Sequence, residues 1–261
     1  MGLTIVITGA GGGIGHALSL EYAQVGTHLI LCDFHKEKLS ATAELCQKTA
    51  ETVDTFCFNM ENPAEVEKTA DQILKTHKSI DRLVLVNGIS QRGKAINTSI
   101  DIDRKIMEIN YFGSIHLTKK LLHPMLKTES PGIGVTSSIS GRFGFHQRSA
   151  YAASKFALHG FYESLRLEHF KDGLSVTIMC PGRINTPISM SAITENGEKH
   201  GQMDPGQSNG MSAATCAKKM HKAIEKGKKD VLIGKKELLM VYFRKYLPFI
   251  FYKFANKINP R

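Results

Sequence analysis

Short apolar runs rich in β-branched residues alternate with longer amphipathic stretches along the whole chain. This alternation is typical of βαβ units, in which parallel strands form a sheet that helices cover on both faces. We therefore predict an α/β fold with a doubly wound, seven-stranded parallel sheet. The expected strands are 3–8, 28–32, 53–58, 82–86, 133–137, 175–180 and 230–233. The clearest expected helices are 16–25, 64–76, 103–126, 150–170 and 213–226.

The chain is long and apolar enough to bury one large core, since it has 261 residues of which 42% are hydrophobic. Its composition excludes a disordered tail, a collagen-like fibre and a disulfide-stapled miniprotein. No Pro-, Gly- or Ser-rich linker divides it, so we expect one binding and catalytic domain over 1–236, with a substrate loop at about 183–210. A basic, aromatic-rich segment at 237–261 completes the chain.

The cysteines indicate the compartment. Their number is odd, none forms a Cys-x-x-Cys pair, and no secretory leader is recognisable, so we expect reduced thiols and a cytoplasmic protein.

The net charge of +10 lies entirely in the last part of the chain, because residues 218–261 hold thirteen Lys and Arg against three acids. Within it, the aromatic run 238–255 is interrupted by Arg244, Lys245, Pro248 and Lys253, which makes it too broken to cross a bilayer. It could lie in a membrane interface at the cytoplasmic face. Equally, it could close the substrate pocket or pair with another subunit. We predict no nucleic-acid partner, because no recognition motif accompanies the charge.

A glycine-rich turn, Thr8 to Gly15, follows the first expected strand and precedes the first expected helix. Glycines there let the backbone approach a pyrophosphate, and the helix N-terminus supplies free N–H groups and a positive dipole. The turn therefore predicts a Rossmann-type dinucleotide site, although its Gly-x-x-x-Gly-x-Gly spacing differs from the generic fingerprint. A merely flexible loop is the alternative.

Asp33 ends the second strand, where a carboxylate can accept hydrogen bonds from an adenine ribose. A 2′-phosphate would meet like charge there, so we expect NAD(H) to be preferred, while His35 and Lys36 leave NADP(H) open. The alternative is that Asp33 only caps the next helix.

Tyr151 and Lys155 stand four residues apart in an expected helix, so both side chains share one face. Ser138 ends a strand at the carboxyl edge of the sheet, where ligands of α/β proteins bind. Together these residues suggest a catalytic group.

With Asn110 and the Pro181-Gly182 pair, these motifs resemble the short-chain dehydrogenase/reductase superfamily, in its branch of about 250 residues, over nearly the whole chain. The resemblance implies as catalytic residues Asn110, Ser138, Tyr151 and Lys155. It implies as cofactor-binding residues Gly9, Gly11, Gly12, Gly13, Ile14, Gly15, Asp33, Phe34, Asn59, Met60, Asn87, Gly88, Tyr151, Lys155, Pro181, Gly182, Ile184 and Thr186.

The implied reaction is hydride transfer between a nicotinamide and a carbon that carries a hydroxyl or carbonyl group. Tyr151 would exchange the proton, and the ammonium group of Lys155 would favour its phenolate and hold the ribose. Ser138 would stabilise the substrate oxygen, and Asn110 would complete a water relay to Lys155. The expected substrate is a hydrophobic secondary alcohol or ketone, or an alcohol or aldehyde, with a lipid-, steroid- or retinoid-like body. The resemblance also implies a homodimer or homotetramer.

Two segments depart from the family pattern. Leu85-Val86-Asn87-Gly88 stands where the family usually has Asn-Asn-Ala-Gly, which we interpret as the loss of two amides, and Asn59-Met60 replaces a frequent Asp. A noncatalytic dinucleotide-binding or membrane-surface scaffold is therefore the alternative function. We expect no metal site, because close His and Cys clusters are missing. Phe143 and His146 could line the substrate pocket or pack within a loop.

Overall fold

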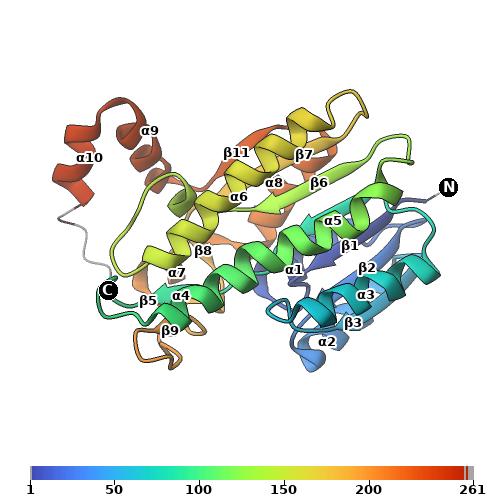
Figure 1. Ribbon diagram of the computed structural model, residues 1–261, viewed down its shortest axis with the longest axis horizontal. Coiled ribbons are helices and arrows are strands. Elements are labelled where there is room, and N and C mark those ends of the chain that lie inside the picture. Colours follow the sequence, from blue (N-terminus) through green and yellow to red (C-terminus); the bar gives the residue numbers. More distant parts are fainter. Residues whose placement is uncertain (1, 256, 258–261) are drawn as a thin grey trace.

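The computed structural model describes residues 2–255 and 257, and its centre is a twisted, wholly parallel sheet. The strand order is β11-β7-β6-β4-β1-β2-β3 (Figure 1). From β1, the chain first adds strands on one side of the sheet, β2 and β3, and then adds β4 and the later strands on the other side. The seven strands are β1 (Thr4–Thr8), β2 (His28–Asp33), β3 (Thr52–Cys57), β4 (Arg82–Leu85), β6 (Gly132–Thr136), β7 (Ser175–Pro181) and β11 (Asp230–Ile233). The predicted seven-stranded fold is confirmed, and each strand boundary lies within one residue of its expected place.

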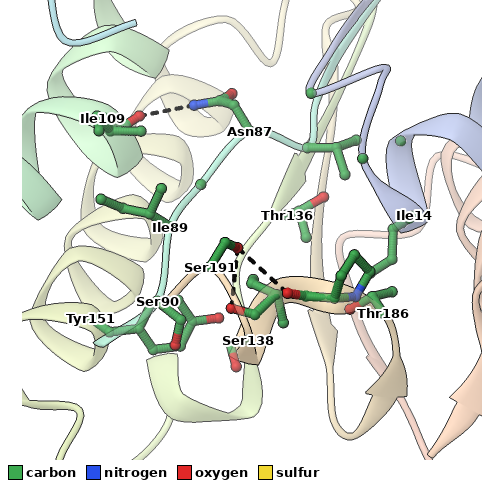
Figure 2. Close-up of a pocket in the computed structure, with 18 of the residues that line it drawn as sticks. Ile14, Asn87, Ile89, Ser90, Ile109, Thr136, Ser138, Tyr151, Thr186 and Ser191 are labelled. Carbon is green, nitrogen blue, oxygen red and sulfur yellow. Dashed lines mark hydrogen bonds between the residues drawn. The ribbon is translucent and has the colours of Figure 1, made fainter. Parts of the chain in front are cut away.

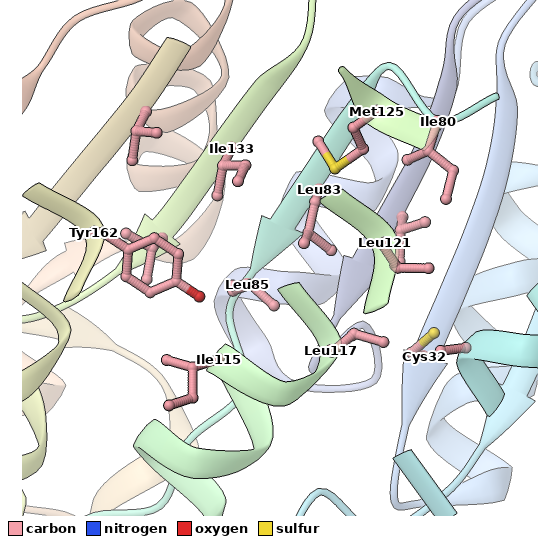
Figure 3. Close-up of a cluster of buried hydrophobic side chains, with 14 of the residues drawn as sticks. Cys32, Ile80, Leu83, Leu85, Ile115, Leu117, Leu121, Met125, Ile133 and Tyr162 are labelled. Atoms are coloured by element: carbon pink, nitrogen blue, oxygen red, sulfur yellow. The ribbon is translucent and has the colours of Figure 1, made fainter. Parts of the chain in front are cut away.

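Helices cover both faces of this sheet, as predicted. One face carries α3 (Pro63–Thr76), α4 (Ile100–Met107), α5 (Gly113–Met125) and α6 (Ser149–Glu168). The other face carries α1 (Gly13–Tyr22), α2 (Lys36–Cys46) and α8 (Ala213–Glu225). Each layer closes its own apolar core, and Figure 3 shows the first one, where Leu83, Leu117 and Tyr162 meet between the sheet and α5–α6.

The expected continuous helix over 103–126 is interrupted. Between α4 and α5 the chain makes a π-helical turn, Glu108–Phe112, and Asn110 in this turn is fully buried. Single π turns are frequent at functional sites. The interruption is therefore relevant to the site described below.

Short elements replace the expected loop over 183–210. They are β8 (Ile184–Asn185), β9 (Ile193–Thr194) and α7 (Pro205–Ser208). β9 pairs with β5 (Gln91–Arg92), and β8 pairs with β10 (Met211–Ser212), so the loop is held to the body by two small sheets.

The C-terminal segment forms two helices, α9 (Leu239–Tyr246) and α10 (Pro248–Ala255), which project from one end of the molecule (Figure 1). Pro248 starts α10, a position where its fixed φ suits a helix and its missing N–H is not needed. Across residues 2–255 and 257, we find no helix with the length and apolarity that a bilayer crossing demands.

Candidate active site

A cleft of about 1290 Å³ opens along the carboxyl edge of the sheet (Figure 2). It lies beside β1 and β4, the neighbouring strands at which the strand order changes side. Ligands of open α/β sheets bind at this kind of crevice. All of the residues that the sequence assigned to the cofactor line it, together with Ser138. Asn110 is the exception among the predicted site residues, because it lies behind the cleft wall.

The glycine turn has the geometry that a pyrophosphate needs. Gly9 has a φ of +67°, which favours glycine, and a side chain on Gly15 would overlap the Gly9 carbonyl oxygen. No side chain caps the start of α1, and no acid lies in its first turn. The free amide groups at this helix N-terminus therefore face the cleft without a competing acceptor from a cap.

Asp33 lies at the same end of the cleft. Its carboxylate accepts hydrogen bonds from the Gly11 amide at 2.9 Å and the His35 amide at 2.8 Å. The alternative that Asp33 caps α2 is wrong, since the N-cap position is His35 and no side chain caps that helix. Asp33 instead fixes the glycine turn against the end of β2.

Tyr151, Ser138 and Lys155 come together on the opposite side of the cleft. The Ser138 hydroxyl lies near enough to the Tyr151 phenol to lower its pKa. Lys155 Nζ lies 5.9 Å from the centre of the Tyr151 ring and donates to the Thr136 carbonyl oxygen at 2.9 Å. The predicted trio therefore lines one cleft.

Burial controls the ionisation of these groups. It raises the pKa of Tyr151 above its ordinary value, while the Ser138 hydroxyl and the charges of Arg148 and Arg92 act in the opposite direction. Burial lowers the pKa of Lys155 to about 8. Tyr151 is therefore a phenol at neutral pH, and Lys155 is an ammonium close to its titration range.

Asn110 holds the strand-end loop rather than facing the cleft. Its Oδ1 accepts from the Ile89 amide at 2.8 Å, and its Nδ2 donates to the Ile89 carbonyl at 3.0 Å and to Ser154 Oγ at 2.9 Å. A side chain on Gly88 would come within 3.2 Å of both Asn110 Oδ1 and Lys155 Nζ. A larger residue at this position would therefore crowd both groups.

Asn87 corrects our interpretation of the segment 85–88. Its Oδ1 accepts from the Thr8 hydroxyl at 2.7 Å, and its Nδ2 donates to the Ile109 carbonyl at 2.9 Å (Figure 2). An amide thus still ties the end of β1 to the π turn. Leu85 and Val86 do lack the two amides, and Asn87 supplies an amide one or two positions later in the sequence.

Four residues of the site escaped sequence reasoning. Asp204, from the loop after β9, pairs with Arg92 Nη2 at 2.6 Å and with Arg148 Nη2 at 2.9 Å, and all three line the cleft. Gln91 also contributes, because its Oε1 accepts from the Ala150 amide at 2.9 Å and so fixes the start of α6. The only available signal was the position of Arg148, three residues before Tyr151.

An apolar wall completes the substrate end of the cleft. Phe143 lines it and packs against Phe251 of α10, with 5.1 Å between the ring centres, and Met240 of α9 lines it as well. His146 lies outside the lining residues, and its ring nitrogen approaches the Ala255 carbonyl oxygen at 3.2 Å. Of the two candidates, Phe143 therefore lines the cleft, whereas His146 makes a loop contact.

Behind Lys155, the side chains of His159, Glu163 and Asp230 bring possible metal-ligand atoms within 4.8 Å of one another. Asp230, however, is already paired with Arg142. A guanidinium at that position competes with any cation. All five cysteines are free thiols, and four of them are buried.

Comparison with known proteins agrees with this geometry. The family model described as short chain dehydrogenase matches residues 3–197. This chain belongs to the short-chain dehydrogenase/reductase family. One family relative, Dehydrogenase/reductase SDR family protein 7-like of Anopheles gambiae, is 35% identical over 99% of this chain and 84% of its own. Dehydrogenase/reductase SDR family member 7B of Bos taurus is 36% identical over 95% of this chain and 79% of its own. The family consists of oxidoreductases.

Solved structures show the same fold. A short-chain dehydrogenase/reductase from Burkholderia phymatum, in complex with NAD, superposes with a TM-score of 0.82 at 23% identity, covering 100% of this chain and 96% of its own. A short chain dehydrogenase from Shigella flexneri, complexed with NADP, gives 0.74 at 25% identity, covering 88% and 95%.

Proposed function

We propose that this chain interconverts a hydrophobic secondary alcohol and ketone, or an alcohol and aldehyde, with a nicotinamide dinucleotide as the redox partner. The observation that carries the proposal is the trio Tyr151, Ser138 and Lys155 at the wall of a cleft that also contains an uncapped glycine turn. The NAD and NADP complexes of the related structures support the choice of cofactor class.

In this proposal, the glycine turn and the start of α1 hold the pyrophosphate, and Asp33 holds the adenine ribose. Phe34, Asn59 and Met60 flank the adenine, while Asn87 and Gly88 lie along the cofactor. Lys155 binds the nicotinamide ribose. The residues that hold the nicotinamide amide are Pro181, Gly182, Ile184 and Thr186. The bound cofactor supplies or accepts the hydride.

Side chains of this protein provide the proton for the reaction. During reduction the Tyr151 phenol donates its proton to the substrate oxygen as negative charge develops there. Ser138 donates a hydrogen bond to the same oxygen. Asn110 keeps the loop at Ile89 open beside Lys155, so that a water chain can return a proton to Tyr151.

The test is replacement of Tyr151 by Phe. We expect turnover of alcohols and ketones to fall by at least about 10²-fold, the usual contribution of a general acid, while cofactor affinity stays within about twofold. Full activity of the Tyr151→Phe variant contradicts the role of the phenol. Tight cofactor binding by the parent enzyme, with no turnover across a panel of alcohols and ketones, favours the noncatalytic scaffold.

We also propose a homodimer or homotetramer formed through the outer surfaces of α4, α5 and α6. Phe112, at the end of the π turn, and Phe156, on α6, are nearly half exposed, and a second cavity of about 470 Å³ lies beside Phe112. Light scattering of the parent chain and of a Phe112→Glu, Phe156→Glu variant tests this interface.

The division into a domain at 1–236 and a segment at 237–261 remains our proposal, as does a cytoplasmic location with peripheral membrane contact through that segment. Tyr246, Phe249, Tyr252 and Phe254 are exposed on α9 and α10. Arg244, Lys245 and Lys253 accompany them, as in helices that lie on anionic membranes.

A further inference from the structure

The substrate end of the cleft carries an excess of buried positive charge. The Arg92 and Arg148 side chains are 4% and 13% exposed, and both line the cleft. Asp204 is the only carboxylate that pairs with either of them within residues 2–255 and 257. Lys155 adds a third buried cation nearby.

Most of the N–H groups of Arg92 already donate to acceptors within the protein. Its Nε and Nη2 donate to the Asp204 carboxylate, and its Nη1 donates to Ser90 Oγ at 2.8 Å and to the Gln91 carbonyl at 2.6 Å. Arg92 therefore anchors Asp204 and the loop that carries it, and contributes charge rather than free donors to the cleft.

Arg148 is different, because most of its donors are unused. Of its five N–H groups, one bonds to Asp204 Oδ2 at 2.9 Å and one to the His146 carbonyl at 3.2 Å. The other three have no partner among the described residues. The guanidinium carbon lies 5.3 Å from the centre of the Phe145 ring, a cation–π contact that helps to hold the side chain in place.

The position of Arg148 brings its positive charge near Tyr151, the proposed proton donor. It is the N-cap residue of α6 and Tyr151 lies in the first turn of that helix. Arg148 and Arg92 both act electrostatically on the Tyr151 phenol. An anionic group bound to Arg148 would thus lie beside the reacting carbon, while Phe143, Phe145 and Met240 offer an apolar surface to the remainder of the molecule.

We propose that the substrate is an amphipathic carbonyl compound or alcohol with an anionic group, a carboxylate or phosphate, close to the reacting carbon and held by Arg148. This inference rests on the proposed function and refines it, because the sequence alone suggested only a hydrophobic substrate. Burying an unbalanced guanidinium is costly, and an anion of the substrate would relieve that cost. When no substrate is bound, the carboxylate of Asp204 neutralises part of the positive charge of Arg148 and Arg92.

The experiment compares two ligands of equal shape that cannot react, decanoate and decanamide, by calorimetry with the protein saturated with NADH. We expect decanoate to bind at least about tenfold more tightly, since a hydrogen bond to a charged group is worth roughly 1.5–3 kcal/mol. In Arg148→Gln the ratio of the two affinities should fall towards one. In Asp204→Asn, which removes the competing carboxylate, the ratio should rise.

The matched control is Arg104→Gln, because Arg104 is exposed on α4 and pairs only loosely with Asp101 at 3.7 Å. It should keep the ratio of the parent protein. Equal affinities of decanoate and decanamide in the parent, or an unchanged ratio in Arg148→Gln, overturn the inference.

Turnover separates this inference from the proposed function. A long-chain keto acid should be reduced with a higher kcat/KM than its methyl ester. A phosphorylated hydroxyketone should likewise be reduced with a higher kcat/KM than the free hydroxyketone. The pair with the larger ratio of kcat/KM values shows whether the preferred anion is a carboxylate or a phosphate. Reduction of the neutral members without a preference overturns the anion site only. A decanoate preference without any turnover overturns the proposed function only.

Discussion

At the scale of single residues, the site depends on how burial changes the ionisation of a few groups. Tyr151 remains protonated because burial raises its pKa, and Lys155 remains charged only up to about pH 8 because burial lowers its pKa to about 8. Both groups lose their protons on the alkaline side, and Lys155 does so first, so Lys155 sets the upper end of the pH window of the proposed reduction.

The first prediction concerns this window. A lysine whose folded-state pKa is lowered keeps its proton below about pH 8 and loses it above. We expect kcat/KM for ketone reduction to fall about tenfold per pH unit above that value. A profile measured from pH 6 to 10 that stays level through pH 9 contradicts the requirement for a charged Lys155.

Asp33 provides the second prediction at this scale. Its carboxylate would repel a 2′-phosphate, so Asp33→Asn should lower the ratio of NADH to NADPH affinity by about tenfold or more, as expected for charges roughly 4 Å apart. Fluorescence titration with both cofactors measures the ratio. Glu44→Gln, an exposed acid on α2, should leave it unchanged. A parent protein that binds NADPH more tightly refutes our assignment for Asp33.

At the scale of elements, the strands could be predicted closely because their β-branched runs are local signals. The π turn could not, and its residue Asn110 bonds to Ile89, twenty-one residues away in the sequence, a contact that no local pattern reveals. The same is true of the Arg148–Asp204 pair, which joins residues 56 positions apart. Motif residues of the site were thus accessible from the sequence, whereas its charge balance was decided by tertiary packing.

A tie between β4 and α8 allows a stability test. Arg82 donates from Nε and Nη2 to the two carboxylate oxygens of Glu225, at 3.1 and 3.0 Å, and the Tyr22 hydroxyl also donates to Glu225. Arg82→Met should lower the free energy of unfolding by about 1–3 kcal/mol, because a carboxylate is left partly buried without its partner.

Urea denaturation of Arg82→Met against Arg104→Met, an exposed arginine, measures the loss. Adding Glu225→Gln to Arg82→Met should recover part of the stability, since the amide oxygen still accepts from Tyr22 without carrying a charge. If the double variant is no more stable than Arg82→Met, the loss does not come from an unpaired charge.

At the scale of the whole molecule, α9 and α10 have two different sides, and these match the two roles that we proposed as alternatives from the sequence. Their inner side contributes Met240 to the cleft and packs Phe251 on Phe143, while their outer side exposes aromatic residues. Removing the whole segment would therefore disturb the substrate pocket, and point substitutions give a cleaner test of membrane contact.

The prediction is that the parent protein floats with vesicles that contain phosphatidylserine, and that Tyr246→Glu with Phe249→Glu abolishes flotation because it places charge where apolar rings would enter the interface. The matched control is Val25→Glu with Leu167→Glu, since both residues are exposed far from the segment in sequence. Equal flotation of the two double variants contradicts membrane contact through α9 and α10.

The π turn has one more consequence. A π turn holds one residue more than the α-helix around it, so deleting a single residue between positions 108 and 112 would let α4 and α5 merge into one regular rod. Such a shortened chain could keep its sheet and both cores while withdrawing the Asn110 carboxamide from the loop at Ile89. Loss of turnover with retained folding in this deletion variant would support the proposed role of Asn110.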